Sequence, residues 1–298
     1  MRSFRVLIIG YGIQGRKRQS FLKNNFVAIV DPVAEEAAYK SIYEVPLDSF
    51  DAALLCVPDQ EKFSIASYLL SNKKHVLVEK PLIFTNEQVE SIKLLSTQAV
   101  CYTAYNHRFE PHFIRMRNHI QSGVLGQIYS CRMFYGNGTA RDVRNSNWRD
   151  EGLGVIHDLG SHLLDTFLFW FNDPGYFFKR ITTKNFENKA PDYAVFHSQN
   201  SAMFVQLEMT MLSWRNHFAC DILAENGSAH IESLCKWGPS SFTTRNRKLP
   251  SGRPDEKVIT LVQSDPTWAL ELEYFKALCA TGYGTNIDND VWIAENLK

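Results

Sequence analysis

The sequence predicts two domains: an α/β domain with a doubly wound parallel sheet at residues 1–122, and an α+β domain with an open, mostly antiparallel sheet at residues 123–298. Three patterns support this prediction. Short apolar segments alternate with helical segments early in the chain. A glycine-rich turn follows the first apolar segment. After Gly126 the apolar segments become longer and alternate with polar residues, as in antiparallel strands.

The composition is that of a globular protein with balanced charge. Of 298 residues, 45% are hydrophobic and 13% are aromatic, which argues against disorder. Lys plus Arg and Asp plus Glu number 32 each, so we expect neither nucleic acid nor a membrane as the main partner. The apolar runs at 6–9 and 163–171 are too short to span a membrane. The six cysteines form no C-x-x-C pair, and we expect reduced thiols in a cytoplasmic protein.

The first strand and the turn after it predict a dinucleotide site. An apolar strand over residues 4–9 leads directly into a G-x-G-x-x-G turn, and a helical segment to about Leu22 follows. In such turns the first glycine permits the tight bend, the second lets a pyrophosphate approach, and the third lets helix and strand pack closely. The positive end of the helix dipole then faces the phosphates. The expected cofactor contacts are Gly10, Tyr11, Gly12, Ile13, Gln14 and Gly15.

The second strand, over residues 26–30, ends on a candidate ribose-binding carboxylate. Asp31 lies 21 residues after Gly10, near the spacing expected for this role. Its carboxylate can accept hydrogen bonds from both ribose hydroxyls and would repel a 2′-phosphate, which favours NAD. Arg16 and Lys17 would soften that repulsion, so NADP stays an alternative. The other interpretation of Asp31 is a turn residue before Pro32.

The alternation of strands and helices continues to about residue 105. We expect strands at 51–57, 75–80 and 99–105, with helices at 59–71 and 86–95 between them. If the strands are parallel, their last residues meet at one edge of the sheet, where ligands bind in open α/β sheets. The expected cofactor contacts at this edge are Cys56, Val57, Pro58, Glu79, Lys80 and Asn106.

Lys80 stands out among these residues. It ends an apolar strand and is followed by Pro81, which cannot donate to a ladder, so strand pairing should stop there. The functional interpretation places its ammonium beside a ligand at the sheet edge. The alternative is a solvated charge at a strand end.

After a helix over 111–122 the pattern becomes that of an antiparallel sheet. Asn226-Gly227 between two strand segments is a strong hairpin signal. A helix over 267–281, and another that begins near Asp288, should follow the strands. The expected strands are 127–135, 176–182, 193–199, 202–212, 217–225 and 228–233.

One helical segment, from about residue 154 to 171, is apolar nearly all round and should be buried. Four polar residues nevertheless share one of its faces at helical spacing: Asp158, Ser161, His162 and Asp165. A buried polar group without a partner costs about 1–3 kcal/mol, so this face should meet either water or a polar site. We expect no metal site, because Asp158 and His162 supply two ligands and no clear third follows.

Together these motifs resemble the glucose-fructose oxidoreductase / inositol dehydrogenase / MocA family. The resemblance implies a Rossmann domain and then a substrate domain whose open sheet commonly mediates oligomerisation, hence a homo-oligomer (dimer or tetramer). It implies hydride transfer between NAD(P) and a carbinol or keto group of a sugar, polyol, sugar acid or nucleotide-sugar. The motifs that carry it are the turn at 10–15, Asp31, Glu79-Lys80-Pro81, Asn106-His-Arg-Phe109 and the segment 152–165.

The resemblance also implies catalytic roles. Lys80 matches the family's lysine near the reacting carbinol and the nicotinamide, and Asp158 and His162 match its acid-histidine pair. Histidine, with an unperturbed pKa near ~6.5, suits the transfer of the hydroxyl proton. Lys80 is the alternative proton carrier, and Asp158 would orient His162 or hold a neighbouring hydroxyl. Position and chemistry suggest these substrate contacts: Asn106, Arg108, Trp148, Arg149 and His157.

The sequence departs from the family pattern in two places. Gly152-Leu153-Gly154 stands where three glycines are common, and Asp59 and Lys62 stand where Asn and His are common, which weakens the transfer of cofactor contacts at that loop. Two other functions fit the fold: a non-catalytic NAD-binding regulator, and a glycoside hydrolase that uses bound NAD. Because the chain ends inside a helical segment, we expect a short or truncated member of the family.

Overall fold

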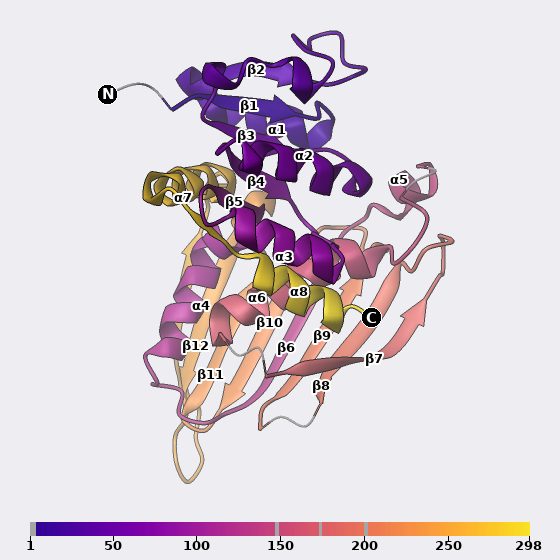
Figure 1. The fold of residues 1–298 in the computed structure, drawn as a ribbon. Coiled ribbons are helices and arrows are strands. Elements are labelled where there is room, and N and C mark those ends of the chain that lie inside the picture. Colours follow the sequence, from indigo (N-terminus) through magenta and orange to yellow (C-terminus); the bar gives the residue numbers. More distant parts are fainter. Residues whose placement is uncertain (1–3, 147–148, 173–174, 200–201) are drawn as a thin grey trace. The chain divides into compact units, whose positions relative to one another are not determined.

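The computed structural model describes most of the chain, which is drawn as a ribbon in Figure 1. The described residues are 4–146, 149–172, 175–199 and 202–298. They fold into two compact units that do not follow the order of the chain. The first unit comprises residues up to 106 together with 268–294, and the second comprises 107–267 together with 295–298.

This division differs from the boundary that the sequence predicts near residue 122. Helix α4 (Pro111–Gln121), predicted as the end of the first domain, packs against α6 (Ser161–Phe171) and strand β12 (Ser240–Asn246) of the second unit. Helix α7 (Thr267–Thr281) and most of α8 (Ile287–Asn296) return to the first unit. Such long-range packing leaves no signal in the local pattern of residues.

The first unit contains a six-stranded sheet in the order β14-β5-β4-β3-β1-β2. All neighbouring strands are parallel, and the order runs outward from β1 in both directions. This confirms the predicted doubly wound sheet and makes the carboxyl end of β1 the point where the strand order reverses. The strands are β1 (Val6–Ile9), β2 (Phe26–Val30), β3 (Ala52–Leu55), β4 (His75–Glu79), β5 (Val100–Ala104) and β14 (Gly284–Thr285).

Alternate strand residues build one core on each face of this sheet. Leu7 and Ile9 belong to a core with buried residues of α2 (Asp59–Ser71), α3 (Asn86–Leu95) and α8. Val6 and Ile8 belong to the core on the other face, with α1 (Ile13–Leu22) and α7. Helices therefore cover both faces, as a parallel sheet requires.

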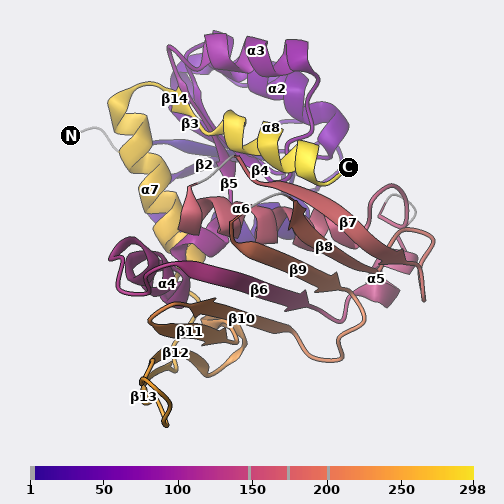
Figure 2. The ribbon, with the colours of Figure 1, turned by 90° about the horizontal axis from the view of Figure 1, so that it is seen from below.

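The second unit contains an eight-stranded sheet in the order β13-β12-β11-β10-β6-β9-β8-β7, which Figure 2 shows from below. Every neighbouring pair is antiparallel except β6 and β9, which are parallel. The prediction of a mostly antiparallel sheet is confirmed. The strands besides β12 are β6 (Ile128–Gly136), β7 (Phe177–Lys184), β8 (Tyr193–Gln199), β9 (Phe204–Thr210), β10 (His217–Ala224), β11 (Gly227–Glu232) and β13 (Asp255–Leu261).

Three elements of the second unit were not predicted: β12, β13 and the short helix α5 (Ala140–Arg144). Strand β13 lies at the edge of the sheet, and most of its residues are exposed. An edge strand that buries little apolar surface lacks the alternation from which strands are read in a sequence. The predicted Asn226-Gly227 hairpin between β10 and β11 is confirmed.

The segment predicted as one regular helix has two parts. A π-helix (Ile156–Gly160) leads into α6, which is buried over most of its length. Gly160 approaches β9 so closely that a Cβ there would lie 3.0 Å from the sulfur of Met209. On α6, the indole nitrogen of Trp170 donates to the carbonyl of Phe113 on α4 at 3.0 Å. π-helical turns are rare and often occur at functional sites.

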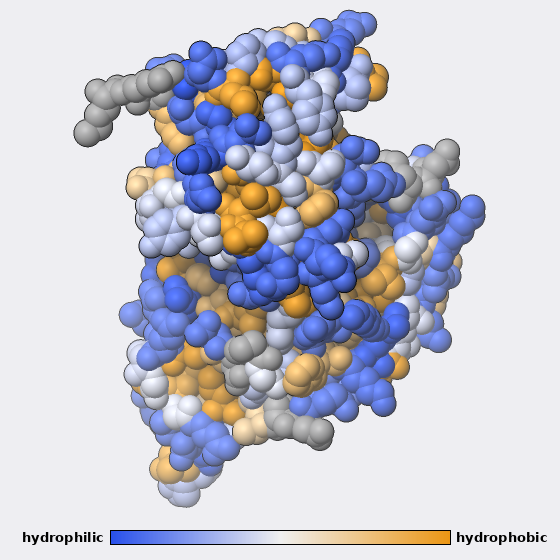
Figure 3. Space-filling view, viewed as in Figure 1, coloured by the Kyte–Doolittle hydropathy of each residue, from blue (hydrophilic) through white to orange (hydrophobic). Residues whose placement is uncertain are grey.

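The surface agrees with the balanced composition. Figure 3 shows hydrophilic side chains interspersed with smaller apolar areas on the face that it presents. Among the helices of the described residues, none is long and apolar enough to cross a bilayer.

Candidate functional site

The three glycines of the turn after β1 have distinct surroundings. Gly10 has φ +88°, which favours glycine, and a Cβ there would lie 2.5 Å from the carbonyl oxygen of Cys56. A Cβ at Gly15 would overlap the carbonyl oxygen of Gly10. A Cβ at Gly12, in contrast, would meet no described atom within 4 Å. Gly10 and Gly15 are therefore needed by the fold, whereas the space over Gly12 suits the approach of a pyrophosphate.

Asp31 follows β2 and lies beside the glycine turn. Its Oδ2 accepts from the backbone N–H of Tyr11 at 2.7 Å, and its Oδ1 accepts from Val33 and Ala34, each at 2.8 Å. Burial alone would raise the pKa of Asp31, but the backbone donors outweigh it and hold the pKa below its usual value. The carboxylate is thus fixed in its ionised form beside the glycine turn, as a ribose-binding residue would need to be.

A cavity of about 690 Å³ lies between the glycine turn, the loop after β2 and the start of α2. Its size falls in the range of small-molecule sites. Six of the predicted cofactor contacts line it: Gly10, Tyr11, Gly12, Asp31, Val57 and Pro58. Within the described part of the first unit, its lining does not include the other predicted contacts: Ile13, Gln14, Gly15, Cys56, Glu79, Lys80 and Asn106.

Basic side chains near Asp31 bear on the choice between NAD and NADP. The guanidinium of Arg16 lies 4.2 Å from the centroid of the Tyr11 ring and bonds to Glu36 at 2.8 Å. Lys17 points elsewhere, with its Nζ 4.0 Å from the Trp268 ring. Lys40 lines the cavity and donates to a backbone carbonyl at 3.0 Å. The sequence reasoning missed Lys40, because it lies in an irregular loop that folds back on the end of β2.

The end of β4 is held by a buried ion-pair network. Arg18, only 3% exposed, donates from Nε to Glu79 at 2.7 Å and from a terminal nitrogen to Glu271 at 2.6 Å. Burial alone would lower the pKa of Arg18, but the two carboxylates outweigh it and raise the pKa. Glu79, predicted as a cofactor contact, therefore joins α1 and α7 to the strand that carries Lys80.

Lys62 holds the backbone that follows Lys80. Its side chain is 3% exposed, and its Nζ donates to the carbonyl of Pro81 at 2.9 Å. The same Nζ lies 2.7 Å from the carboxylate of Asp59. The lysine that departs from the family pattern thus fixes the Glu79-Lys80-Pro81 segment in this protein. Asp59 does not cap α2 with its side chain, because the preceding Pro58 occupies the cap position.

In the second unit, the polar face of α6 is packed rather than solvated. The Asp165 side chain is 1% exposed and accepts from Nε and a terminal nitrogen of Arg108 at 2.6–3.0 Å. A buried carboxylate needs such a partner, and a bidentate arginine satisfies both of its oxygens. Arg108, predicted as a substrate contact, therefore has a structural role in this unit.

His162 belongs to a cluster of aromatic and basic side chains. It is 9% exposed and stacks on His107, with ring centroids 4.0 Å apart and planes 18° apart. The Nε2 of His107 lies 3.0 Å from the Nζ of Lys236. The Tyr135 ring lies 6.1 Å from the His162 ring, and burial and then the carboxylate of Asp158 raise the pKa of Tyr135. The cluster thus gathers residues from four separate parts of the chain.

The remaining predicted residues are less defined by their contacts. His157 and Asp158 lie in the π-helix and are half-buried, and Arg149 is half-buried in the turn after α5. Trp148 lies outside the described residues. In the part of the chain that the structure describes, no group of three His, Cys, Asp or Glu side chains is placed to hold a metal ion.

Three members of the cluster were not identified in the sequence: His107, Tyr135 and Lys236. His107 lies within the Asn106-His-Arg-Phe109 motif and was therefore within reach of motif reasoning. Lys236 lies in a short turn (Cys235–Trp237) after β11, where no periodicity marks it. Tyr135 reads as an ordinary inward-facing residue of β6.

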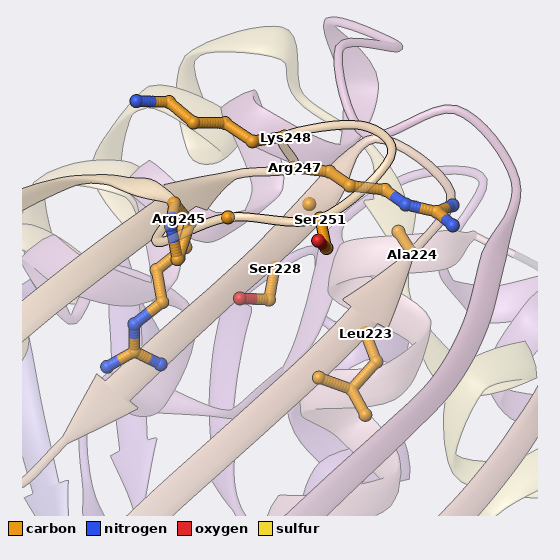
Figure 4. Close-up of a pocket in the computed structure, with 10 residues that line it drawn as sticks. Leu223, Ala224, Ser228, Arg245, Arg247, Lys248 and Ser251 are labelled. Atoms are coloured by element: carbon orange, nitrogen blue, oxygen red, sulfur yellow. The ribbon is translucent and has the colours of Figure 1, made fainter.

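A second cavity, of about 400 Å³, lies in the second unit by β10 and β11 (Figure 4). Three basic residues line it, but they point in different directions and each has a partner. Arg245 bonds to Glu256 at 2.6 Å, Arg247 to the carbonyl of Glu225 at 3.0 Å, and Lys248 to Asp255 at 2.8 Å. The cavity contains none of the predicted site residues, and carboxylates pair with Arg245 and Lys248.

Comparisons with known proteins agree with this architecture. A family model described as an oxidoreductase family with an NAD-binding Rossmann fold matches residues 4–107, and one described as the GFO/IDH/MocA C-terminal domain matches residues 113–230. A solved structure of levoglucosan dehydrogenase with NADH and levoglucosan has the same fold, with a TM-score of 0.82 at 16% identity over 99% of this chain and 97% of that one.

Similarity in sequence covers less of each chain. An uncharacterized oxidoreductase of Schizosaccharomyces pombe is 31% identical over 142 residues, which are 46% of this chain and 38% of that protein. The scyllo-inositol 2-dehydrogenase (NADP+) of Bacillus subtilis is 31% identical over 106 residues, 34% of this chain and 29% of that one. The matches thus span well under half of these relatives. Both parts of the chain match one family, and the protein belongs to the glucose-fructose oxidoreductase / inositol dehydrogenase / MocA family of NAD-binding oxidoreductases.

Proposed function

We propose that the protein is an NAD(P)-dependent dehydrogenase or reductase that acts on a carbinol or keto group of a sugar, polyol, sugar acid or nucleotide-sugar. The observation that carries the proposal is the cavity between Gly12 and Asp31. It combines open space over a glycine turn with an ionised carboxylate, which are the features that the pyrophosphate and the adenosine ribose of a dinucleotide require.

The cofactor choice we propose is NAD, with NADP as the alternative. Asp31 supports NAD, because an ionised carboxylate accepts from ribose hydroxyls and repels a 2′-phosphate. Lys40 and Arg16 line the same cavity and would offset part of this repulsion. The glycine turn would hold the pyrophosphate through its backbone N–H groups and the start of α1.

The reaction we propose uses Lys80, Asp158 and His162. The nicotinamide, when bound, supplies the hydride acceptor or donor. Lys80 would hydrogen-bond the carbinol oxygen, and His162 would take the hydroxyl proton during oxidation and return it during reduction. Asp158 would orient His162 or hold a neighbouring hydroxyl. Lys80 as the proton carrier is the alternative within this proposal.

The named relatives support the substrate class. Besides the B. subtilis protein, they include a myo-inositol 2-dehydrogenase of Thermotoga maritima, 27% identical over 110 residues that form 36% of this chain and 31% of that one. These names describe the relatives, and the class that they share is a polyol or sugar carbinol.

The test is a steady-state assay with NAD and NADP against a panel of polyols, sugars, sugar acids and nucleotide-sugars. We expect substrate-dependent, net formation of reduced nicotinamide, which Lys80→Ala and His162→Ala abolish without loss of cofactor binding. Cofactor binding without turnover on any member of the panel would favour a regulator. Cleavage of a glycoside without net reduction of the cofactor would favour the hydrolase.

We further propose a cytoplasmic homo-oligomer. The six cysteines, all of which are described, form no disulfide. Phe204, Leu223 and Val258 are about half exposed on the open face of the eight-stranded sheet, which supports pairing with a second copy. Light scattering after gel filtration would test this, and a monomer at all concentrations would contradict it.

A further inference from the structure

We propose that His107 and Lys236 are positioning residues for His162, and that they direct the substrate proton to His162 rather than to the histidine stacked on it. The inference rests on the proposed function, in which His162 exchanges a proton with the carbinol. It adds two residues to the site and assigns different roles to two stacked imidazoles.

The geometry of the stack fixes the plane of the His162 ring. His107 is 3% exposed and lies nearly parallel to His162, with centroids 4.0 Å apart. The edge of Phe113 packs against His107 at 6.0 Å, and Tyr135 lies 5.5 Å from the same ring. Close packing on a rigid neighbour restricts rotation of the His162 ring, and catalytic rings need such support to stay in the productive geometry.

Lys236 sets the protonation of His107. Its Nζ lies 3.0 Å from the His107 Nε2. An ammonium has three donors and no acceptor, so Nε2 accepts and carries no proton. His107 is then neutral, with its proton on Nδ1. The Trp237 ring, whose centroid lies 4.7 Å from Nζ, and the Tyr135 hydroxyl at 3.5 Å both favour the charged form of Lys236.

The turn that carries Lys236 is itself anchored. Buried Glu110 accepts from the backbone N–H of Cys235 at 3.3 Å and from its thiol at 2.9 Å. Glu110 also lies close enough to Lys236 for the ammonium to stabilise its carboxylate. These contacts hold the ammonium at Nε2 of His107 through a single 3-10 turn.

The charges around the stack then give the two histidines different roles as proton acceptors. Two stacked imidazolium rings would repel, and Lys236 already occupies the basic nitrogen of His107. Asp158 lies close enough to Tyr135 that, after burial, its carboxylate raises the pKa of the Tyr135 hydroxyl. A proton taken from the carbinol therefore goes to His162, whose cation would face a neutral ring. Lys236 and Tyr135 contact the pair. Glu110 acts electrostatically on Lys236, and Asp158 acts on Tyr135.

The experiment uses the full chain and three variants: Lys236→Met, Lys236→Arg and, as a matched control, Lys248→Met. Lys248 is a half-exposed lysine of the same unit, paired with Asp255. Long-range ¹H–¹⁵N spectra of the histidine side chains report the tautomer of His107, assigned with a His107→Gln variant. Steady-state kinetics with the nicotinamide cofactor report kcat and KM separately.

We expect His107 of the unmodified protein to show a protonated Nδ1 and an unprotonated Nε2 near pH 7. Lys236→Met should release Nε2 for protonation and lower kcat about tenfold, with KM for the cofactor unchanged. Lys236→Arg should retain the tautomer and most of kcat, and Lys248→Met should match the unmodified protein.

Two results would overturn the proposal. One is a His107 protonated at Nε2 in the unmodified protein. The other is an unchanged kcat in Lys236→Met under conditions in which His162→Ala is inactive. The tautomer is read without turnover, so a failure of the proposed function, with no activity on any substrate, would not be mistaken for a failure of this inference. If Lys236→Met does not fold, the tautomer of the unmodified protein and the Lys236→Arg kinetics still test the proposal.

Discussion

The candidate functional region of the first unit depends mainly on the backbone, whereas that of the second unit depends on side chains. In the first unit the cavity depends on backbone geometry. Gly10 has a φ of +88°, and neither Gly10 nor Gly15 has room for a side chain. Backbone N–H groups donate to the carboxylate of Asp31. In the second unit the cluster depends on side chains that meet from α6, β6 and two turns. Local motifs mark six of the residues that line the first cavity but not Lys40. Of the stacked and basic side chains in the second cluster, they mark only His162.

The largest expected effect tests the chemistry of the second unit. His162→Ala should lower kcat by about 10²–10⁴-fold, the usual contribution of a general acid or base. The dissociation constant of the cofactor should not change, because the dinucleotide cavity is lined by the first unit alone. His217→Ala, a partly exposed histidine paired with Glu232, serves as the control. Equal loss in both variants would mean that the His162 effect is not catalytic.

The next prediction compares alanine substitutions at Gly12 and Gly15 within the first unit. Gly12→Ala should keep the melting temperature but weaken cofactor binding at least about tenfold, which is ~1.4 kcal/mol. Gly15→Ala should instead cost about 1–3 kcal/mol of stability, because its methyl group would overlap the Gly10 carbonyl. The control is Gly252→Ala, where the nearest atom is 3.6 Å from the new Cβ. Calorimetry and cofactor titration measure both quantities.

A similar loss of stability in Gly12→Ala and Gly15→Ala would contradict the assignment of Gly12 to cofactor binding and Gly15 to the fold. It would mean that the space over Gly12 is filled when the protein is free of cofactor, and that all three glycines serve the fold.

Lys62 tests whether a buried side chain can act on the first unit's site through the backbone. Lys62→Met removes the donor to the Pro81 carbonyl and should lower kcat several-fold, up to about tenfold, by loosening Lys80. Its matched control is Asp59→Asn, which breaks the exposed side of the ion pair and should change stability by less than about 1 kcal/mol. Stopped-flow or steady-state kinetics would detect the change. An unaltered kcat would limit Lys62 to a structural role.

The smallest effect concerns the pH dependence of stability. The folded-state pKa of Asp31 lies below its unfolded value, so its carboxylate stabilises the fold fully above the unfolded pKa near ~3.9. This stabilisation is lost as the pH falls through the lower folded value. Asp31→Asn should therefore be less stable than the unmodified protein at pH 7, and the difference should shrink below about pH 4. Thermal melts between pH 3 and 7 would show a constant difference if backbone bonding to Asp31 were unimportant.

Much of the first unit could be predicted because its elements carry local signals. The strand that ends at Lys80, the capping box of Thr85 and Gln88 on α3, and the glycine turn each follow from a short run of residues. The roles of Glu79 and Lys62 could not be predicted. Both depend on partners that are distant in sequence, Arg18 for one and the Pro81 carbonyl for the other.

In the second unit, more of the contacts depend on residues that are distant in sequence. Asp158 and His162 were predicted as site residues because they share one face of an apolar helix, although the π-helix before α6 was not expected. His107 and Lys236 lie 129 positions apart, and nothing local links them. Strand β13 was missed for a related reason, since an exposed edge strand is specified by its neighbour β12 rather than by its own apolar pattern.

The return of α7 and α8 to the first unit has a consequence for how this protein is made. Glu271 and Phe275 of α7 and Ile287 of α8 are fully or almost fully buried there, and β14 extends the sheet beside β5. A ribosome releases these pieces only after residues 107–267, which belong to the second unit. The nucleotide-binding unit is therefore completed only after most of the second unit has been made, and residues 107–267 form an insertion within it. A fragment cut after residue 122 would leave Arg18 buried without Glu271, so this unit cannot be excised as a simple N-terminal cassette.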